Sequence, residues 1–160
     1  MIIPATLDAG AARTSWRWPL TSTLPPLGAL PTAPGLARAH VSAVLPGWQM
    51  GDLGDAAALV ASELVTNALR ASTTPAGGPC YVDGQMALIW VCLMSDWSRL
   101  LIEVHDQADG KPLMRDPGPD AETGRGLQMV DWMTSGRWGW NPKIGRPGKC
   151  VWAELHAEQD

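Results

Sequence analysis

The stretch SELVTNALRAS, residues 62–72, lies in the most clearly periodic part of the chain. Apolar residues recur there every three or four positions, which predicts a helix with one buried face. The same helix carries Glu63 and Asn67 four positions apart, with Thr66 and Arg70 beside them, and residues at that spacing share a face. A helix that only packs against a core needs no such polar row, so these side chains are candidates for a functional site.

Two kinds of chemistry fit this polar row. The amide oxygen of Asn67 can ligate a hard cation such as Mg²⁺, which prefers oxygen ligands. The carboxylate of Glu63 can orient or deprotonate a nearby nucleophile. Taken alone, however, the same residues are typical of an ordinary solvated helix face.

Further elements are predicted from periodicity and turn residues. The helix that contains residues 62–72 is expected to begin at an N-cap formed by Asp52 and to end before the Thr-Pro pair at 74–75. A shorter helix is expected at residues 33–45 and a third from about Gly126. Apolar or alternating runs predict strands at residues 16–20, 86–94, 100–106, 137–141 and 149–156.

This order of elements predicts an α+β two-layer sandwich. A mixed or antiparallel sheet of about five strands would carry the three predicted helices on one face. Residues 1–15 show no periodicity and are expected to be a mobile tail, so that residues 16–160 form a single domain. The Pro- and Gly-rich run at 20–35 is expected to be a loop, and the long irregular stretch at 107–124 a functional loop.

Composition argues against several classes of protein. The formal net charge is −4, which does not favour binding to a nucleic-acid backbone. No apolar run approaches the roughly 18 residues of a membrane span, and residues 1–10 lack the features of a signal peptide. The three cysteines form no CxxC pair, and His40, His105 and His156 show no metal-ligand spacing. We therefore expect neither a disulfide scaffold nor a zinc site, and a reduced, cytoplasmic setting.

A second candidate site is the sequence TGRGLQMV at residues 123–130. Gly124 and Gly126 directly precede a helical pattern, with Arg125 between them. Glycine lets the backbone approach a ligand, and a helix N-terminus presents unpaired N–H groups and partial positive charge, which suits a phosphate. The alternative is a plain glycine-rich loop before a helix, because the P-loop pattern is absent and no strand precedes the glycines.

A third candidate is Asp106, which ends the strand predicted at 100–106 and enters a loop that contains Gly110. A carboxylate at that place could accept a hydrogen bond from the amino group of a nucleotide base. The alternative is an ordinary aspartate at the junction of a strand and a loop, where this residue type is common.

The order of these sites is more specific than any one of them. ELVTN on a helix, D-x-x-x-G after a strand, a long loop and G-R-G-L at the start of a helix resemble the histidine-kinase-like ATPase superfamily. More narrowly, the chain resembles the small single-domain branch that contains anti-sigma-factor serine kinases. The resemblance covers about residues 16–155. It implies a sheet covered on one face by helices, with ATP held between the helices and a lid at 107–123.

The resemblance implies a role for each matching residue. Glu63 would activate the attacking hydroxyl or water, Asn67 would hold Mg²⁺ against the phosphates, and Asp106 would bind the adenine amino group. The other matched positions would line the adenine site or place backbone N–H groups around the phosphates: Ala108, Gly110 and Cys150 near the adenine, and Gly124, Arg125, Gly126 and Leu127 near the phosphates.

Three positions depart from the family pattern. Ala108 stands where the family's D-x-G-x-G loop has its first glycine. Cys150 stands where the last strand often has a threonine that supports the adenine contact through water, and a thiol is a weak hydrogen-bonding group. Glu122 stands where some of these kinases have a basic residue before the G-x-G. The last departure weakens the expectation of phosphoryl transfer more than that of ATP binding.

Two functions are therefore compatible with the sequence. The first is a Mg-ATP-dependent serine/threonine kinase that phosphorylates a small anti-anti-sigma-type protein and thereby controls a sigma factor; such kinases often form homodimers. The second is a regulatory module that binds a nucleotide, or only a protein partner, without catalysis. An autonomous ATPase or a fragment of a sensor kinase fits less well, because the sequence contains no phosphoacceptor-histidine helix.

Overall fold

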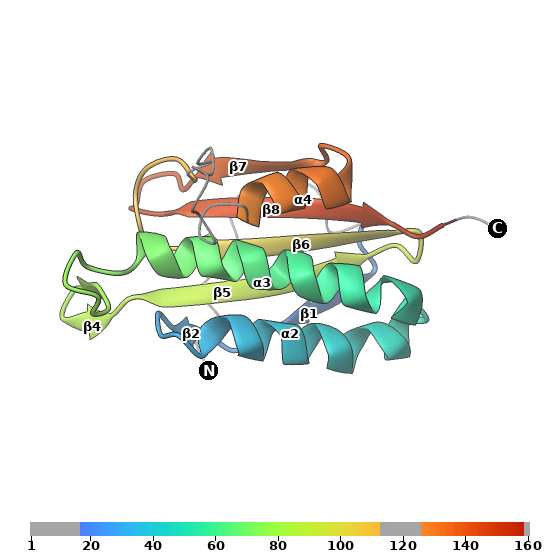
Figure 1. Cartoon of the computed structure of the whole chain (residues 1–160), viewed down its shortest axis with the longest axis horizontal. Coiled ribbons are helices and arrows are strands. Elements are labelled where there is room, and N and C mark those ends of the chain that lie inside the picture. The colour runs from blue at the N-terminus through green and yellow to red at the C-terminus, as the bar shows by residue number, and fades with distance from the viewer. Residues whose placement is uncertain (1–16, 113–125, 159–160) are drawn as a thin grey trace, which may run out of the picture.

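The computed structural model describes residues 17–112 and 126–158. They form two layers, an antiparallel β-sheet and a layer of α-helices that covers one face of the sheet (Figure 1). The helices are α2 (Ala33–Val44), α3 (Gly54–Ala71) and α4 (Gly126–Thr134). The predicted α+β two-layer architecture, with helices on one face, is thereby confirmed.

The main sheet has six strands, and every pairing in it is antiparallel. Five strands follow the spatial order β1-β5-β6-β8-β7, and the short β2 pairs with β5. β3 and β4 form a separate hairpin. The bounds are β1 Leu20–Thr23, β2 Leu27–Gly28, β3 Tyr81–Val82, β4 Gln85–Met86, β5 Leu88–Ser95, β6 Arg99–Asp106, β7 Trp138–Pro142 and β8 Lys149–His156.

Alternation along the strands explains how the sheet joins the helices. In β6 the sequence RLLIEVHD places Leu100, Ile102, Val104 and Asp106 on one face, where all four are buried. This face belongs to the same core as the apolar stripe of α3, in which Leu64 is fully buried. The core therefore lies between the sheet and α3, and Asp106 enters it at the last position of its strand.

The predicted start of the sheet is wrong. The first strand is not residues 16–20 but β1, and the run at 20–35, expected to be a loop, contains both β1 and β2. Pro19 precedes β1 directly, and a proline has no N–H to continue a strand ladder. Trp18 is buried outside any strand, and the Arg99 guanidinium lies 4.9 Å from its ring centroid.

The predicted N-cap of the long helix is also wrong. Asp52 lies in a 3₁₀ turn, Gly51–Leu53, that leads directly into α3. Leu53 is the N-cap residue, and its backbone is already helical, with φ −84° and ψ −3°. Asp52 is therefore one residue too early to cap the helix with its side chain. The β3–β4 hairpin is an addition to the predicted elements.

Some predictions fall on residues that the structure does not describe. The expected tail at 1–15 and most of the expected lid, including Glu122, lie outside the described residues.

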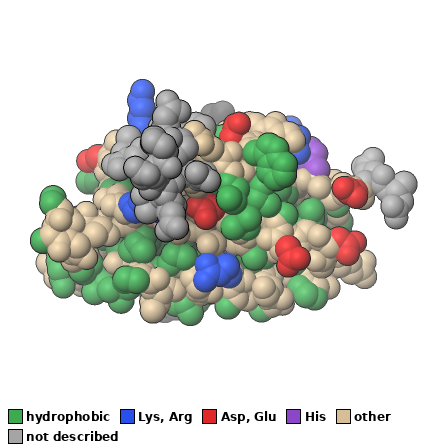
Figure 2. Space-filling model, in the orientation of Figure 1, with side chains coloured by type: hydrophobic (Ala, Val, Ile, Leu, Met, Phe, Trp, Pro, Cys, Tyr) green, Lys and Arg blue, Asp and Glu red, His purple; other side chains and the backbone are tan. Residues whose placement is uncertain are grey.

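Among the described residues, no helix has both the length and the hydropathy needed to cross a lipid bilayer. The outer surface of the helix layer carries interspersed hydrophobic, acidic and basic side chains rather than a basic field (Figure 2).

Replacement of Leu64 by alanine should destabilise the fold by leaving a cavity between α3 and the sheet. Leu64 is fully buried, and changes of this kind in protein cores cost about 2–5 kcal/mol. Leu36→Ala on α2 is the matched control, because Leu36 is 49% exposed and its loss should cost about 0.5 kcal/mol or less. Urea unfolding followed by tryptophan fluorescence measures both changes, and equal losses would contradict this placement of the core.

Candidate functional site

Glu63 lies where α3 meets the first residue of α4. A side chain at Gly126 would collide with the Glu63 carboxylate, so the glycine allows α4 to begin directly against this group. The structure thus brings Glu63 and Gly126 of the predicted site together, while Gly124 and Arg125 lie outside the described residues. Leu127 is buried in the core and anchors the first turn of α4.

Asn67 follows one turn after Glu63 on α3. Its side-chain oxygen Oδ1 is buried and accepts no hydrogen bond from the described residues. A buried polar atom without a partner costs about 1–3 kcal/mol, so packing alone does not explain this arrangement. An amide oxygen of this kind is a suitable ligand for a hard cation such as Mg²⁺.

Asp106 is fully buried at the end of β6, where its carboxylate is paired with Lys149. The two residues are direct partners in the antiparallel register of β6 and β8. Lys149 Nζ donates a hydrogen bond to Oδ1 at 3.1 Å and lies 3.0 Å from Oδ2. Oδ2 itself receives no hydrogen bond from the described residues. The ammonium thus lies against both oxygens, and Oδ2, to which the Ala108 N–H does not donate, keeps a lone pair that can accept a further hydrogen bond.

The surroundings of Asp106 act on its charge in opposite directions. Burial raises the pKa of the carboxyl, and the Lys149 ammonium opposes that shift. The Ala108 N–H donates a hydrogen bond of 2.9 Å to Oδ1 and acts in the same direction as the lysine. Lys149 also donates a hydrogen bond of 3.3 Å to the Ala108 carbonyl. A buried ion pair needs such additional bonds to offset the removal of both charges from water.

Further contacts hold the loop after β6 and the connection between β7 and β8 beside this ion pair. Lys143 Nζ donates a hydrogen bond of 2.7 Å to the Asp106 carbonyl, and the Gly148 N–H donates one of 3.2 Å to Asp109 Oδ1. Gly148 has φ +115°, and a side chain there would collide with the Asp106 carbonyl oxygen. The connection between β7 and β8 therefore packs directly against the backbone at the end of β6.

Gly110 and Ala108, the two other predicted residues of the Asp106 loop, differ in backbone conformation. Gly110 has φ +97°, and a side chain there would meet nothing within 4 Å, so the conformation of the backbone explains this glycine. Ala108 is not among the residues with positive φ. An alanine therefore causes no backbone strain at the position where the family pattern has a glycine.

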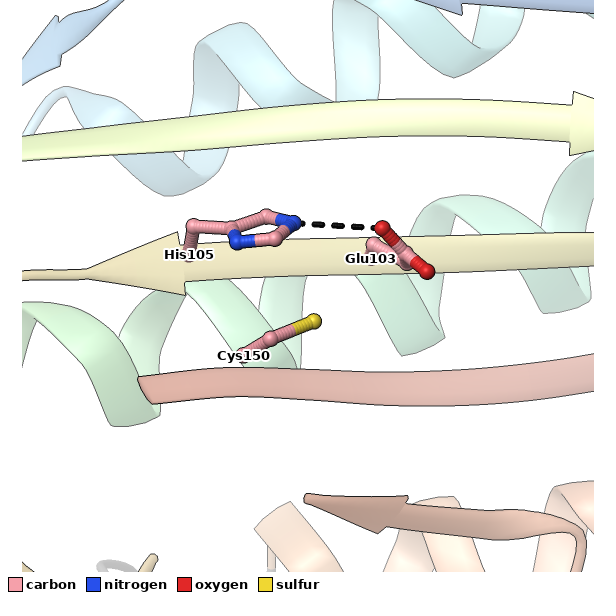
Figure 3. A group of neighbouring side chains, drawn as sticks. All are labelled: Glu103, His105 and Cys150. Carbon is pink, nitrogen blue, oxygen red and sulfur yellow. Dashed lines mark hydrogen bonds and ion pairs between the residues drawn. The ribbon is translucent and has the colours of Figure 1, made fainter. Parts of the chain in front are cut away.

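Cys150 lies on the other face of the sheet, away from the Asp106 carboxylate. Side chains alternate along β8, so the neighbour of Lys149 points to the face that the helices do not cover. Cys150 therefore does not face the Asp106 carboxylate, and Lys149 is the β8 residue beside it. Cys150 instead stands beside Glu103 and His105 (Figure 3).

Lys149 is a site residue that the sequence motifs do not reveal. A signal for it nevertheless exists in the strand KCVWAELH, where Val151, Ala153 and Leu155 form one buried face and Lys149 falls on the same face. A lysine is almost never fully buried unless it is paired with an anion. A core-facing lysine at the start of one strand therefore predicts a partner such as Asp106 at the end of its neighbour.

The end of β6 and the C-terminal half of α3 lie toward the same end of the molecule in Figure 1, and the first turn of α4 lies nearer the middle of the helix layer. These elements carry a buried amide oxygen without a donor, a buried carboxylate oxygen that is ion-paired with Lys149, and a second carboxylate at the start of α4. Chemically, such a set can accept a hydrogen bond from an amino group, ligate a cation and orient a hydroxyl.

No protein-family model matches this chain, and no curated protein shows significant similarity to it. Function is therefore argued from the geometry of the site, together with the resemblance of its sequence motifs.

Loss of the Lys149 ammonium should destabilise the protein strongly at neutral pH. Lys149→Met leaves the Asp106 carboxylate buried without its partner, which costs about 3–5 kcal/mol. The same change at the exposed Lys111 should cost about 0.5 kcal/mol or less. Urea unfolding of both variants at neutral pH measures the difference.

The deficit of Lys149→Met should also depend on pH. Without the ammonium, the pKa of folded Asp106 lies further above its unfolded value of about 4. Below the unfolded pKa of Asp106, the carboxyl is protonated in both states and does not lower the stability of the variant. As the pH rises through the folded pKa, the carboxyl must ionise inside the core, and the free energy of unfolding of the variant decreases. A deficit that is the same at acidic and neutral pH would contradict the ion pair.

Proposed function

We propose that this chain binds an adenine nucleotide with Mg²⁺ and acts as a regulatory serine/threonine kinase on a small protein partner. One observation carries the proposal. Among the described residues, Asn67 Oδ1 and Asp106 Oδ2 are the only carbonyl or carboxylate side-chain oxygens that are buried without a hydrogen bond. They come from different elements, and they are the positions that the resemblance assigns to the cation and to the adenine. Buried polar atoms normally have partners, and this ligand would satisfy both.

Asp106 would recognise the base. Its Oδ2 would accept a hydrogen bond from the amino group of adenine, while the Ala108 N–H holds Oδ1 and the Lys149 ammonium lies against both oxygens. The ammonium favours the ionised form of Asp106, which can only accept hydrogen bonds. A base with a carbonyl group in place of the amino group would present a second acceptor to this oxygen. The site would therefore favour adenine over hypoxanthine.

Asn67 and Glu63 would act at the phosphate end. Bound Mg-ATP would supply the phosphoryl group and the cation that neutralises its charge. Asn67 Oδ1 would ligate that cation. Glu63 would orient the serine or threonine hydroxyl of the partner and take its proton as the hydroxyl oxygen bonds to the γ-phosphorus and the bond from that phosphorus to ADP breaks. Gly126, which has no side chain, allows the N-terminus of α4 to lie directly against the Glu63 carboxylate.

The partners follow from the resemblance alone. A small anti-anti-sigma-type protein would receive the phosphate, and a sigma factor would be the regulated protein. A cytoplasmic setting and a homodimer belong to the same proposal.

A second candidate function is a regulatory module that binds a nucleotide, or only a protein, without catalysis. One specific contact favours it. Lys149 already neutralises Asp106 from within the fold, so part of the adenine site is satisfied without any ligand. In this case the ion pair is structural, and Glu63 has no chemical role.

Binding of Mg-ATP should raise the thermal stability of the protein, and the rise should depend on Asn67. A ligand at about 100 times its Kd stabilises the fold by about 2.7 kcal/mol, which is several degrees in Tm for a chain of this size. Asn67→Ala should abolish the part of the rise that requires Mg²⁺. Asn141→Ala, the same change at an exposed position of β7, should leave it intact. Differential scanning fluorimetry with ATP, with and without Mg²⁺, tests this, and no rise with any adenine nucleotide would contradict nucleotide binding.

Glu63→Gln separates the kinase from the non-catalytic module. The amide cannot take a proton, so phosphate transfer should fall by about 100-fold or more, while the thermal shift with Mg-ATP should persist. The assay incubates the protein with γ-labelled ATP and fractionated small proteins of its own cell, and follows label on serine or threonine. Label that Glu63→Gln abolishes supports the kinase. Absence of label in every fraction, with nucleotide binding intact, favours the non-catalytic module.

A further inference from the structure

We propose that Glu103, His105 and Cys150 form a binding site for a divalent transition metal, with Zn²⁺ as the best-matched ion. Glu103 and His105 come from β6 and Cys150 from β8, and all three project to the face of the sheet that the helices do not cover (Figure 3). His105 and Cys150 are direct partners across the two strands. One ligand atom from each side chain lies within 4.8 Å of the others.

The distances between these three ligand atoms are close to the distances between ligand atoms in a metal site. Bonds of about 2.0–2.3 Å at tetrahedral angles place neighbouring ligand atoms about 3.3–3.6 Å apart. Glu103 Oε2 and His105 Nε2 already lie 3.1 Å from each other. Small side-chain rotations would bring Cys150 Sγ to a similar distance, because antiparallel pairing holds its backbone directly opposite that of His105. The backbone therefore needs no rearrangement to close the site.

The donor atoms indicate which ion fits. Imidazole nitrogen, thiolate sulfur and carboxylate oxygen are the three ligand types of Zn²⁺, whereas Mg²⁺ prefers oxygen alone. Three protein ligands leave the fourth position for water. The Glu103 and His105 side chains are each 15% exposed, which gives the ion a route from solvent. Burial and the Glu103 carboxylate raise the pKa of the Cys150 thiol, so uptake of the ion would release the thiol proton.

The charges around the three ligands also favour a cation. Lys143 is the basic group whose charge acts on Cys150. Its ammonium donates to the Asp106 carbonyl and lies 4.9 Å from the centroid of the Trp90 ring. Once the thiol has lost its proton on uptake of the ion, Glu103 and the Cys150 thiolate together carry two negative charges against this positive charge.

The neighbouring thiol does not belong to the cluster. Cys92 is the cross-strand partner of Glu103 on β5, and the Thr23 hydroxyl donates to its sulfur at 3.4 Å. Cys92 therefore has a partner of its own, and its substitution provides a stringent control.

The metal site is independent of the proposed nucleotide site. Asp106 and Lys149 face the helices, whereas His105 and Cys150, their immediate neighbours in sequence, face the other way. Failure of nucleotide binding would therefore leave this inference unaffected.

Titration of the reduced, metal-free full-length protein with Co²⁺ tests the site. We expect one Co²⁺ per chain, with a thiolate-to-cobalt charge-transfer band and intense visible bands of tetrahedral coordination, all displaced by Zn²⁺. Cys150→Ser should remove the charge-transfer band. His105→Gln should weaken Zn²⁺ binding by about 100-fold or more, because even groups that only support a ligand contribute 10–100-fold. Cys80→Ser and Cys92→Ser should retain both the band and the affinity.

Circular dichroism and thermal unfolding of each metal-free variant show whether it is folded. Absence of the charge-transfer band from the native protein would overturn the proposal. So would a band that survives in folded Cys150→Ser, or one that disappears with Cys92→Ser or Cys80→Ser.

Discussion

The buried ion pair between Asp106 and Lys149 is the interaction on which the candidate site depends. It joins the end of β6 to the start of β8 inside the core, where an unpaired carboxylate would be too costly to keep. Its backbone contacts fix the loop that leaves β6 through Ala108. The Lys149 ammonium lies 3.1 Å from Oδ1 and 3.0 Å from Oδ2, and the Ala108 N–H donates to Oδ1 alone, so Oδ2 is the oxygen with more capacity left to accept from a ligand. The same contact thus stabilises the fold and sets the direction from which a ligand could approach.

The register of β6 and β8 separates two kinds of chemistry onto two faces of one sheet. Asp106 and Lys149 form one cross-strand pair, and His105 and Cys150 form the next. Successive side chains point to opposite faces, so the first pair lies under the helices and the second on the uncovered face. A slip of one residue would exchange the two faces, burying an imidazole and a thiol and exposing the ion pair. The buried apolar residues of both strands oppose such a slip, since they would move out of the core with it.

Much of the fold could be predicted from the sequence because the core elements have strong periodicity. α3, β6 and β8 each place apolar residues at the spacing of their own geometry, and their bounds are close to the predicted ones. The short β1 and β2 could not be predicted, because they are held by pairing with β5 rather than by a pattern of their own.

The candidate site could be predicted only in part, and for a related reason. Glu63, Asn67 and Asp106 stand in recognisable local motifs. Lys149 acquires its role only through its partner on the neighbouring strand. The same holds for Cys150, which motif order assigns to the adenine side and strand alternation assigns to the opposite face. His105 shows no metal-ligand spacing in sequence, because its nearest thiol comes from another strand. Contacts between strands distant in sequence require the register, and single-sequence patterns do not supply it.

The proposed nucleotide site depends on Asp106 Oδ2 accepting a hydrogen bond from an adenine amino group. Isothermal titration of the full-length protein with Mg-ATP and with Mg-ITP tests this most directly, because in ITP a carbonyl replaces the amino group and the adjacent N1 carries a hydrogen. The account predicts that ATP binds and that ITP binds at least about tenfold more weakly, since a missing hydrogen bond to a charged group costs about 1.5–3 kcal/mol. Equal affinities for the two nucleotides, or no binding of either, would contradict it.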